Sequence, residues 1–408
     1  DLNPVAGLLT WASLNLLGGG PEVQEEVMKV QAEVLAEADR KITEWGIEHN
    51  ERGERADAFL YCVEVKPEGC DYYIPLAPCW LVGEKSKVVC DWKRVEGSDR
   101  LEPEIRAVDA AEVKAYKGNK LRGIIPKNAT VVDSRVVDPF DEDRSWSVEG
   151  LRGTEGLRRW VNEDLVPRSG DVFQERLYCI RWVDEKGKRR YAAPVKDDLK
   201  REVEVLKLLQ EHFAEWQENG WIPRKEIPEG GAKTEEPIRT RGWTYWHQLF
   251  TPRQLLTHGL LAKQSEIRAG TAIEQVGCFL GLGRIADWDS RLGAWMFHKG
   301  NEKGNQVFYN QALNCHYNYS GRGFVKLDDT FRVLKPNPFA KLGGSQNVAA
   351  SDARDLRETC DLWITDPPYA DAVNYHELGD FFLAWYDKAL AATFPEWTPD
   401  ARAELAVR

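Results

Sequence analysis

The residues best suited to chemistry form one short run, Asp366-Pro367-Pro368-Tyr369, directly after the strand-like run 361–365, Asp-Leu-Trp-Ile-Thr. Two consecutive prolines fix the backbone and remove two N–H donors, so they favour a rigid turn with outward-facing carbonyls. A carboxylate and a carbonyl can only accept hydrogen bonds, which suits a substrate group that presents two N–H donors. The tyrosine ring could stack on a flat heterocycle. The run therefore predicts a site that grips the amino group of an aromatic ring.

Such an amino group is a weak nucleophile, because its lone pair is delocalised into the ring. Acceptors that hold both N–H groups favour a pyramidal nitrogen, whose lone pair can then attack an electrophilic methyl group. This chemistry needs no metal ion, and we predict none. A buried turn in which Asp366 caps the next segment would also explain the tetrad. Its place after a strand-like run, as at the carboxyl edge of a parallel sheet, favours catalysis.

The tetrad and the residues before it resemble the catalytic block of the S-adenosylmethionine-dependent amino-methyltransferases that modify adenine N6 in DNA. In that family an acidic residue and an alanine precede an apolar strand that ends in Thr-Asp-Pro-Pro-Tyr. Here Asp352, Ala353 and the run 360–365 stand in the same order. The resemblance implies that Asp352 accepts a hydrogen bond from the adenine amino group of the cofactor. It places Ala353 beside that ring.

Two further segments resemble the family's cofactor site. Residues 1–4, Asp-Leu-Asn-Pro, are similar to the end of the second strand, where an acidic side chain binds the ribose hydroxyls. The resemblance therefore implies that Asp1 and Asn3 contact S-adenosylmethionine. Residues 249–254 resemble the segment that packs near the methionine end of the cofactor. The resemblance therefore implies that Thr251 is a further cofactor contact.

A third segment, Asn374 and Tyr375, follows the tetrad closely. In the resembled enzymes this stretch lines the base pocket, so Tyr375 is expected to contact the target adenine. The alternative interpretation is the N-terminus of a helix with Asn374 as its cap.

The implied reaction is a direct transfer of methyl from S-adenosylmethionine to adenine N6. Asp366 and the Pro367 carbonyl would hold the amine, and Tyr369 would stack on the base. Because N6 is paired inside double-stranded DNA, the enzyme must flip the nucleotide out of the helix.

Together with Arg239-Thr240-Arg241-Gly242-Trp243, these blocks look like one subgroup: the large adenine-specific DNA methylases associated with a zinc ribbon, often found in phage-defence islands. The resemblance implies a restriction-modification or phage-defence system. It names double-stranded DNA as the main partner and other subunits of such a system as further candidates.

The fold that the resemblance implies is the class I S-adenosylmethionine-dependent methyltransferase fold: α/β, Rossmann-like, with a mostly parallel sheet and a large α+β insertion. We expect residues 1–50 to form its N-terminal part. Residues 51–240 would be the insertion, to which position alone assigns target recognition. Residues 241–408 would complete the methyltransferase domain and carry the catalytic motif.

Local patterns predict individual elements within this plan. Helical periodicity runs through residues 22–49, 196–219 and 377–392. Runs rich in β-branched and aromatic residues at 58–65 and 176–182 predict strands.

The sequence departs from the family in two places. The family's glycine-rich cofactor loop should lie just before Asp1, so we expect further residues upstream. A zinc ribbon needs close pairs of cysteines, whereas Cys62, Cys70, Cys79 and Cys90 are widely spaced. Buried thiols on strands are the simpler interpretation of these cysteines, and a zinc site is the alternative.

A net charge of −11 excludes a protein that holds nucleic acid by bulk positive charge. Basic residues must then be concentrated on the DNA-facing surface or come from a partner. The run Lys186 to Arg190 could track phosphates, or it could be the solvated tip of a hairpin. No membrane span or secretory signal is predicted, and the few cysteines suit thiols in the cytoplasm.

Two other functions remain open. One is methylation of an amino group on RNA or on a protein amide; Asp366 speaks against the amide, because Asn commonly replaces it there. The other is a DNA-binding or scaffolding subunit with little or no turnover.

Overall fold

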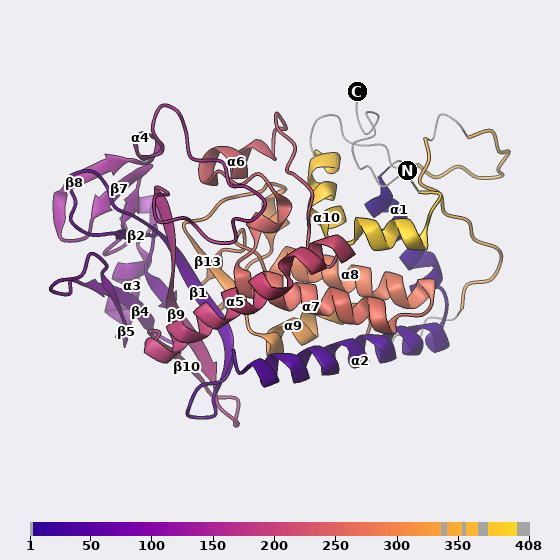
Figure 1. Cartoon of the computed structure of the whole chain (residues 1–408), viewed down its shortest axis with the longest axis horizontal. Coiled ribbons are helices and arrows are strands. Elements are labelled where there is room, and N and C mark those ends of the chain that lie inside the picture. The colour runs from indigo at the N-terminus through magenta and orange to yellow at the C-terminus, as the bar shows by residue number, and fades with distance from the viewer. Residues whose placement is uncertain (1–2, 336–340, 353–355, 366–373, 398–408) are drawn as a thin grey trace.

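The computed structural model describes residues 3–335, 341–352, 356–365 and 374–397. Figure 1 shows most strands on one side of the molecule and the long helices on the other. Two hydrophobic clusters match this division, since one lies among the helices and the other among the strands.

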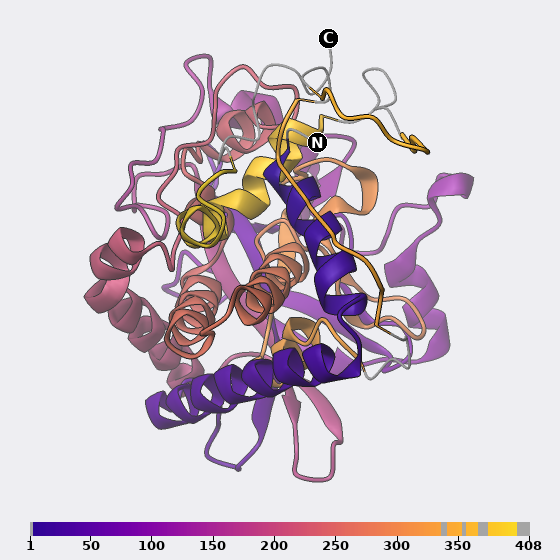
Figure 2. The ribbon, with the colours of Figure 1, turned by 90° about the vertical axis from the view of Figure 1, so that its right-hand side faces the viewer.

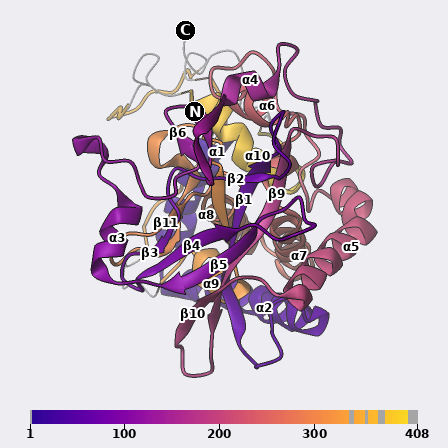
Figure 3. The ribbon, with the colours of Figure 1, turned by 90° about the vertical axis from the view of Figure 1, so that its left-hand side faces the viewer.

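The largest sheet is built around β1 (Arg55–Val65). One edge of β1 pairs with β9 (Phe173–Val183), and β10 (Arg189–Ala192) lies beyond β9. The other edge pairs with β13 (Asn318–Arg322) and then with β2 (Ile74–Leu76). Figure 3 shows this curled sheet from the strand side. Strand β13 comes from the last part of the chain, so residues far apart in sequence complete one sheet.

Three smaller sheets and two short helices surround this sheet. Their elements are β3 (Leu81–Gly83), β4 (Val88–Lys93), β5 (Glu102–Ala107), α3 (Ala110–Lys117), β6 (Val131–Val132), β7 (Arg135–Asp138), β8 (Asp141–Ser147), α4 (Val148–Arg152), β11 (Trp295–Met296) and β12 (Lys303–Gly304).

The other helices form the second layer. They are α1 (Pro4–Ala12), α2 (Pro21–Trp45), α5 (Lys196–Asn219), α6 (Glu235–Arg241), α7 (Pro252–Arg268), α8 (Ala272–Trp288), α9 (Phe324–Phe331) and α10 (Tyr375–Thr393). A π-helical turn follows α1 at Ser13–Leu17, and 3-10 turns occur at Lys120–Arg122, Trp246–Leu249 and Val307–Asn310. Of these helices, none has both the length and the apolar composition that crossing a bilayer requires.

Most of the local predictions are confirmed, but the strand expected at residues 361–365 is not formed. The helical patterns correspond to α2, α5 and α10, and the strand-like runs to β1 and β9. Both α2 and α5 end at a glycine with positive φ, Gly46 at 65° and Gly220 at 81°, a backbone conformation that stops a helix.

The predicted fold class is wrong. In the part of the chain that the structure describes, every ladder between strands is antiparallel, and no parallel Rossmann-like sheet occurs there. The one parallel pairing in that part is an isolated bridge between Tyr73 and Arg100.

The apolar run before the tetrad shows the physical reason. A strand of a parallel sheet is buried on both faces. Here Leu362, Trp363 and Ile364 are 73%, 55% and 87% exposed, and residues 361–365 form no strand. The run has the composition of a buried strand but no sheet covers it.

Candidate functional site

The helix that follows the tetrad, α10, is anchored at its first turn. The Glu377 carboxylate is almost fully buried and accepts hydrogen bonds from the backbone N–H groups of residues 232–234, at 2.8–3.0 Å. Asn374 donates its side-chain amide to the same carboxylate at 3.1 Å. Burial raises the pKa of Glu377, but these backbone hydrogen bonds outweigh it, so the pKa lies below its ordinary value. The ionised carboxylate fixes where α10 begins.

An aromatic cluster holds the middle of α10 against the segment before α7. The ring of Phe250 lies 4.9 Å from that of Trp385 and 5.7 Å from that of Phe381, measured between centroids. Thus the predicted cofactor segment 249–254 does pack on the helix that follows the tetrad. Aromatic pairs at this spacing stabilise beyond their buried area.

Thr251 itself is turned into the core. It is 2% exposed, and its hydroxyl accepts the N–H of Gln254 at 3.2 Å, while the Gln254 side chain accepts the N–H of Thr251 at 2.8 Å. This reciprocal capping box starts α7. The Thr-x-x-Gln spacing is a helix-start signal, and the structure gives Thr251 that structural role.

Helix α1 meets the far end of α10. Asn3 caps α1 by accepting the N–H of Val5 at 2.9 Å. Trp11 packs edge-on against Phe394, with ring centroids 5.3 Å apart. Figures 1 and 2 place the N-terminal ends of α1 and α10 at the same side of the molecule. The described residues nearest to the predicted ribose-binding and catalytic segments therefore lie in one region.

Of the other predicted site residues, six lie outside the described part of the chain and three lie within it. Asp1, Ala353, Asp366, Pro367, Pro368 and Tyr369 lie outside the described residues. Asp352 is half-buried in irregular backbone, and Tyr375 is 42% exposed in the first turn of α10. Asn374 occupies the N-cap position of that helix.

Sequence reasoning missed Glu377 as the residue that anchors this region. Asn374 and Glu377 are spaced as the N-cap and N3 positions of a helix, which signals a local contact. Nothing local could show that residues 232–234 supply the other donors.

A cavity of about 290 Å³ borders the second half of α10, between α7 and α8. Its walls include the aromatic side chains Trp221, Phe279, Trp385 and Tyr386. Tyr386 has non-helical backbone angles, φ −145° and ψ 16°, which kink α10 at the cavity. Because the tetrad precedes the first half of α10, we assign no part of the reaction to this cavity.

The four cysteines considered for zinc are free thiols. Cys62, Cys70 and Cys90 are buried, and burial raises the pKa of Cys79 to about 11. A metal ligand must be a thiolate, which burial disfavours. Among residues 3–335, 341–352, 356–365 and 374–397, no three or more His, Cys, Asp or Glu side chains are placed to hold a metal ion.

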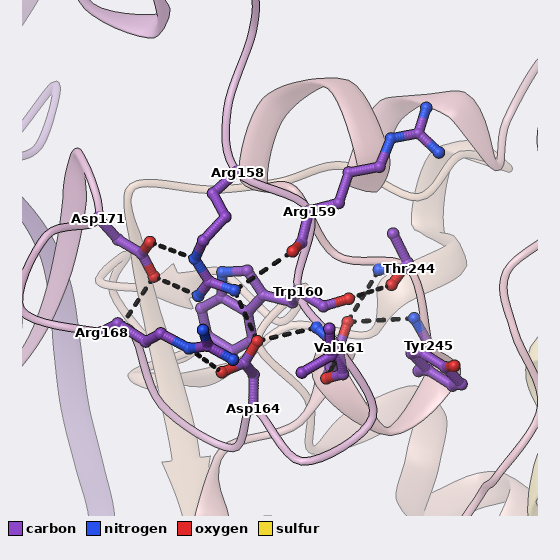
Figure 4. Close-up of polar contacts among 10 residues, drawn as sticks. Arg158, Arg159, Trp160, Val161, Asp164, Arg168, Asp171, Thr244 and Tyr245 are labelled. Carbon is purple, nitrogen blue, oxygen red and sulfur yellow. Dashed lines mark hydrogen bonds and ion pairs between the residues drawn. The ribbon is translucent and has the colours of Figure 1, made fainter.

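A charged network lies in the loop between α4 and β9 (Figure 4). Arg158 binds both carboxylate oxygens of Asp171 at 2.7 Å and also contacts Asp164 at 2.6 Å. Arg168 contacts the second oxygen of Asp164 at 2.7 Å, and the N–H of Val161 donates to the first at 2.8 Å. Two arginines thus balance two aspartates. We interpret this network, termed the Asp164 network, as structural.

No protein-family model, no curated protein and no solved structure matches this chain. We therefore argue function from the chemistry and geometry of the residues themselves.

Proposed function

We propose that the protein is a methyltransferase that methylates adenine N6 in DNA. The single observation that carries the proposal is the run Asp366-Pro367-Pro368-Tyr369. Its acceptors suit both N–H groups of the adenine amine, and its aromatic ring suits the base. S-adenosylmethionine would supply the electrophilic methyl group.

The described surroundings support this proposal in one respect. The tetrad stands shortly before α10, whose start is fixed by Glu377 and residues 232–234. A site that holds an amine in a fixed geometry needs a rigid support close by. Residues 361–365 form no strand, so a place at the carboxyl edge of a parallel sheet no longer supports the proposal, which rests on the chemistry of the tetrad.

The described residues do not form a cofactor site by themselves. The side-chain oxygens of Asn3 and Thr251 both serve as helix caps, and Thr251 is buried. We therefore leave Asn3 and Thr251 out of the proposed site. Asp1, Asp352 and Ala353 stay as proposed contacts on the strength of the resemblance, with Tyr375 on the base side.

The decisive experiment is a methyl-transfer assay with DNA, RNA and protein substrates. Wild-type protein is expected to label DNA. Asp366→Ala should lose ~100-fold or more of that activity, because removal of one preorganised hydrogen-bonding group at a reacting centre costs about that much. Asp143→Ala is the matched control, since it makes the same change at an exposed residue of β8, outside the segments that resemble the family's motifs.

Three outcomes would contradict the proposal: full activity in Asp366→Ala, an equal loss in both variants, or labelling of RNA or protein in preference to DNA. N6-methyladenine in genomic DNA after expression of the intact gene would extend the proposal to restriction-modification or phage defence.

A further inference from the structure

A second cavity, of about 300 Å³, lies where the edge of the large sheet meets the loop at residues 300–304 and the start of α9. We term it the basic cavity. The charged side chains that line it are Lys85, Arg181, Arg189, Lys303, Arg322 and Lys326, against two acids, Asp57 and Glu302. An excess of positive charge is therefore gathered in one place, in a chain whose net charge is −11.

The first acid, Asp57, is already neutralised. Its fully buried carboxylate binds the guanidinium of Arg181 through one oxygen and that of Arg189 through the other, the latter at 3.0 Å. Two positive charges thus face one negative charge. Arg181 is itself buried, and its next contact is the carbonyl oxygen of Glu302, which carries no charge.

The second acid, Glu302, is likewise occupied. One carboxylate oxygen accepts the backbone N–H groups of residues 85 and 86 at 3.0 and 2.8 Å. The other accepts the hydroxyl of Tyr191 at 2.9 Å. None of these donors is a lysine or arginine side chain, so Glu302 balances no cation by direct contact.

Among the described residues, no carboxylate forms an ion pair with the remaining cations of the cavity. The guanidinium of Arg322 donates to the carbonyls of Trp288 and Gly304, at 3.0 and 3.2 Å, and to the hydroxyl of Thr330 at 3.2 Å. Burial lowers the pKa of Arg322, the carboxylate of Asp289 acts against this effect, and Arg181 adds to it. Asp289 accepts the backbone N–H of Arg322 at 2.7 Å rather than its guanidinium. Within the part of the chain that the structure describes, no carboxylate lies within 4 Å of this guanidinium.

The three lysines share this property. No described carboxylate forms an ion pair with Lys85, Lys303 or Lys326; Lys303 instead lies 4.9 Å from the centre of the Trp288 ring. Like charges held together repel one another, and an anion bound among them would remove that cost.

A buried hydroxyl also points to a ligand. Ser320 lines the basic cavity and is 3% exposed, yet its Oγ has no hydrogen-bond partner among the described residues. A buried polar group without a partner costs free energy. Gly304, another lining residue, lies close by: a Cβ there would come within 2.5 Å of this Oγ.

The basic run of the sequence leads into this cavity. Arg189, the first residue of β10, lines it, and the exposed Lys186 and Lys188 continue from it to the tip of the hairpin between β9 and β10. Figure 1 shows this hairpin projecting at the bottom of the molecule. A row of cations that extends beyond one cavity suits a polymer of phosphates better than a single small anion.

We infer that the basic cavity binds a backbone phosphate of DNA, with Arg322, Ser320 and the three lysines as its donors. The choice of DNA rests on the proposed function. Phosphate offers several acceptor oxygens that bridge guanidinium, ammonium and hydroxyl groups at once. Contacts of this kind fix the position of the duplex without reading its sequence.

The test measures binding of a fluorescently labelled DNA duplex to the full chain. Fluorescence anisotropy gives the binding constant at each of several salt concentrations. The variant Lys85→Ala/Lys303→Ala removes two exposed side chains and leaves the core intact. It should bind more weakly to every duplex sequence. The slope of log K against log salt should become shallower by about 1 for each lysine removed.

The matched control is Lys29→Ala/Lys114→Ala, which removes the same charge from exposed lysines of α2 and α3 that also form no ion pair with a described carboxylate. It should leave the slope unchanged. Equal slopes for the two double variants would overturn the inference.

Two further measurements test whether the bound phosphate belongs to DNA. Inorganic phosphate at matched ionic strength should weaken DNA binding by the wild type more than by the cavity variant. Binding of inorganic phosphate without binding of DNA, or a preference for RNA duplex over DNA, would overturn the assignment to DNA. These assays need no turnover, so cavity-dependent DNA binding without methylation would contradict the proposed function alone.

Discussion

The Asp164 network and the basic cavity each bring several charged side chains together, but only the first is balanced. In the network, Arg158 forms ion pairs with Asp164 and Asp171, and Arg168 forms one with Asp164, so each charged side chain has a partner of opposite charge. In the cavity, Arg322 contacts two carbonyls and a hydroxyl, and the three lysines form no ion pair with a described carboxylate. The difference separates charges that we interpret as structural from charges that we infer to bind a ligand.

The largest loss of stability is expected when one carboxylate of the Asp164 network is removed. Asp164→Ala removes a 6% exposed carboxylate that two arginines and a backbone N–H share. The free energy of unfolding should fall by about 3 kcal/mol, because the arginines lose charged hydrogen bonds inside a partly buried site. Urea unfolding measures this loss. Asp361→Ala, at an exposed position, should change stability little; a similar loss in both would show that the network is not structural.

The same network predicts a dependence on pH. Burial raises the pKa of Asp164, but hydrogen bonds from Arg158, from the N–H of Val161 and from Arg168 outweigh it, so the pKa lies below its ordinary value of 3.8. On acidification the unfolded chain takes up this proton before the folded chain does, so protonation favours unfolding. The stability that Asp164 contributes is therefore complete well above pH 3.8 and is lost as the pH falls below it.

Urea unfolding of wild type and Asp164→Ala at pH 7 and at about pH 3 checks the direction of this effect. The difference between the two proteins should be smaller at the lower pH. A difference that grows on acidification would contradict the assigned ion pairs.

The smallest changes in stability are expected at two buried hydroxyl groups, those of Thr251 and Ser320. Thr251 makes a helix cap, so Thr251→Ala should lower the free energy of unfolding by about 1 kcal/mol. Ser320 has no described partner, so Ser320→Ala should leave stability unchanged or raise it slightly. Ser320→Ala should also weaken binding of DNA, whereas Thr251→Ala should not. Thermal unfolding and anisotropy separate the two; equal stability losses would show that Ser320 has a structural partner.

Individual helices and strands could be predicted from the sequence, whereas the pairing of the strands could not. The helix at residues 196–219 follows from periodicity and from the glycine that ends it. Strand β1 is buried along nearly its whole length, which is typical of a strand in a parallel sheet. The structure instead covers both faces of a central antiparallel strand. That arrangement depends on the pairing of β1 with β9 and β13. Local patterns predict β1 and β9 as strands, but they do not show which strands pair.

The same limit holds for the charges. Four of the five residues at 186–190 are basic, but neighbouring residues on a strand point to opposite faces. Arg189 therefore lines the basic cavity, while Arg190 pairs with Glu54. Which cations lack a partner depends on carboxylates distant in sequence, so the cavity could not be predicted from the run alone.

The pairing of β13 with β1 has a consequence for synthesis of the protein. While the chain emerges from the ribosome, β1 and β9 can associate early, but one edge of β1 waits until Asn318–Arg322 has been made. An unpaired strand edge readily recruits other chains. Chaperone occupancy is thus expected to persist during translation until β13 emerges, and products that stop before Asn318 should aggregate more than those that include Arg322.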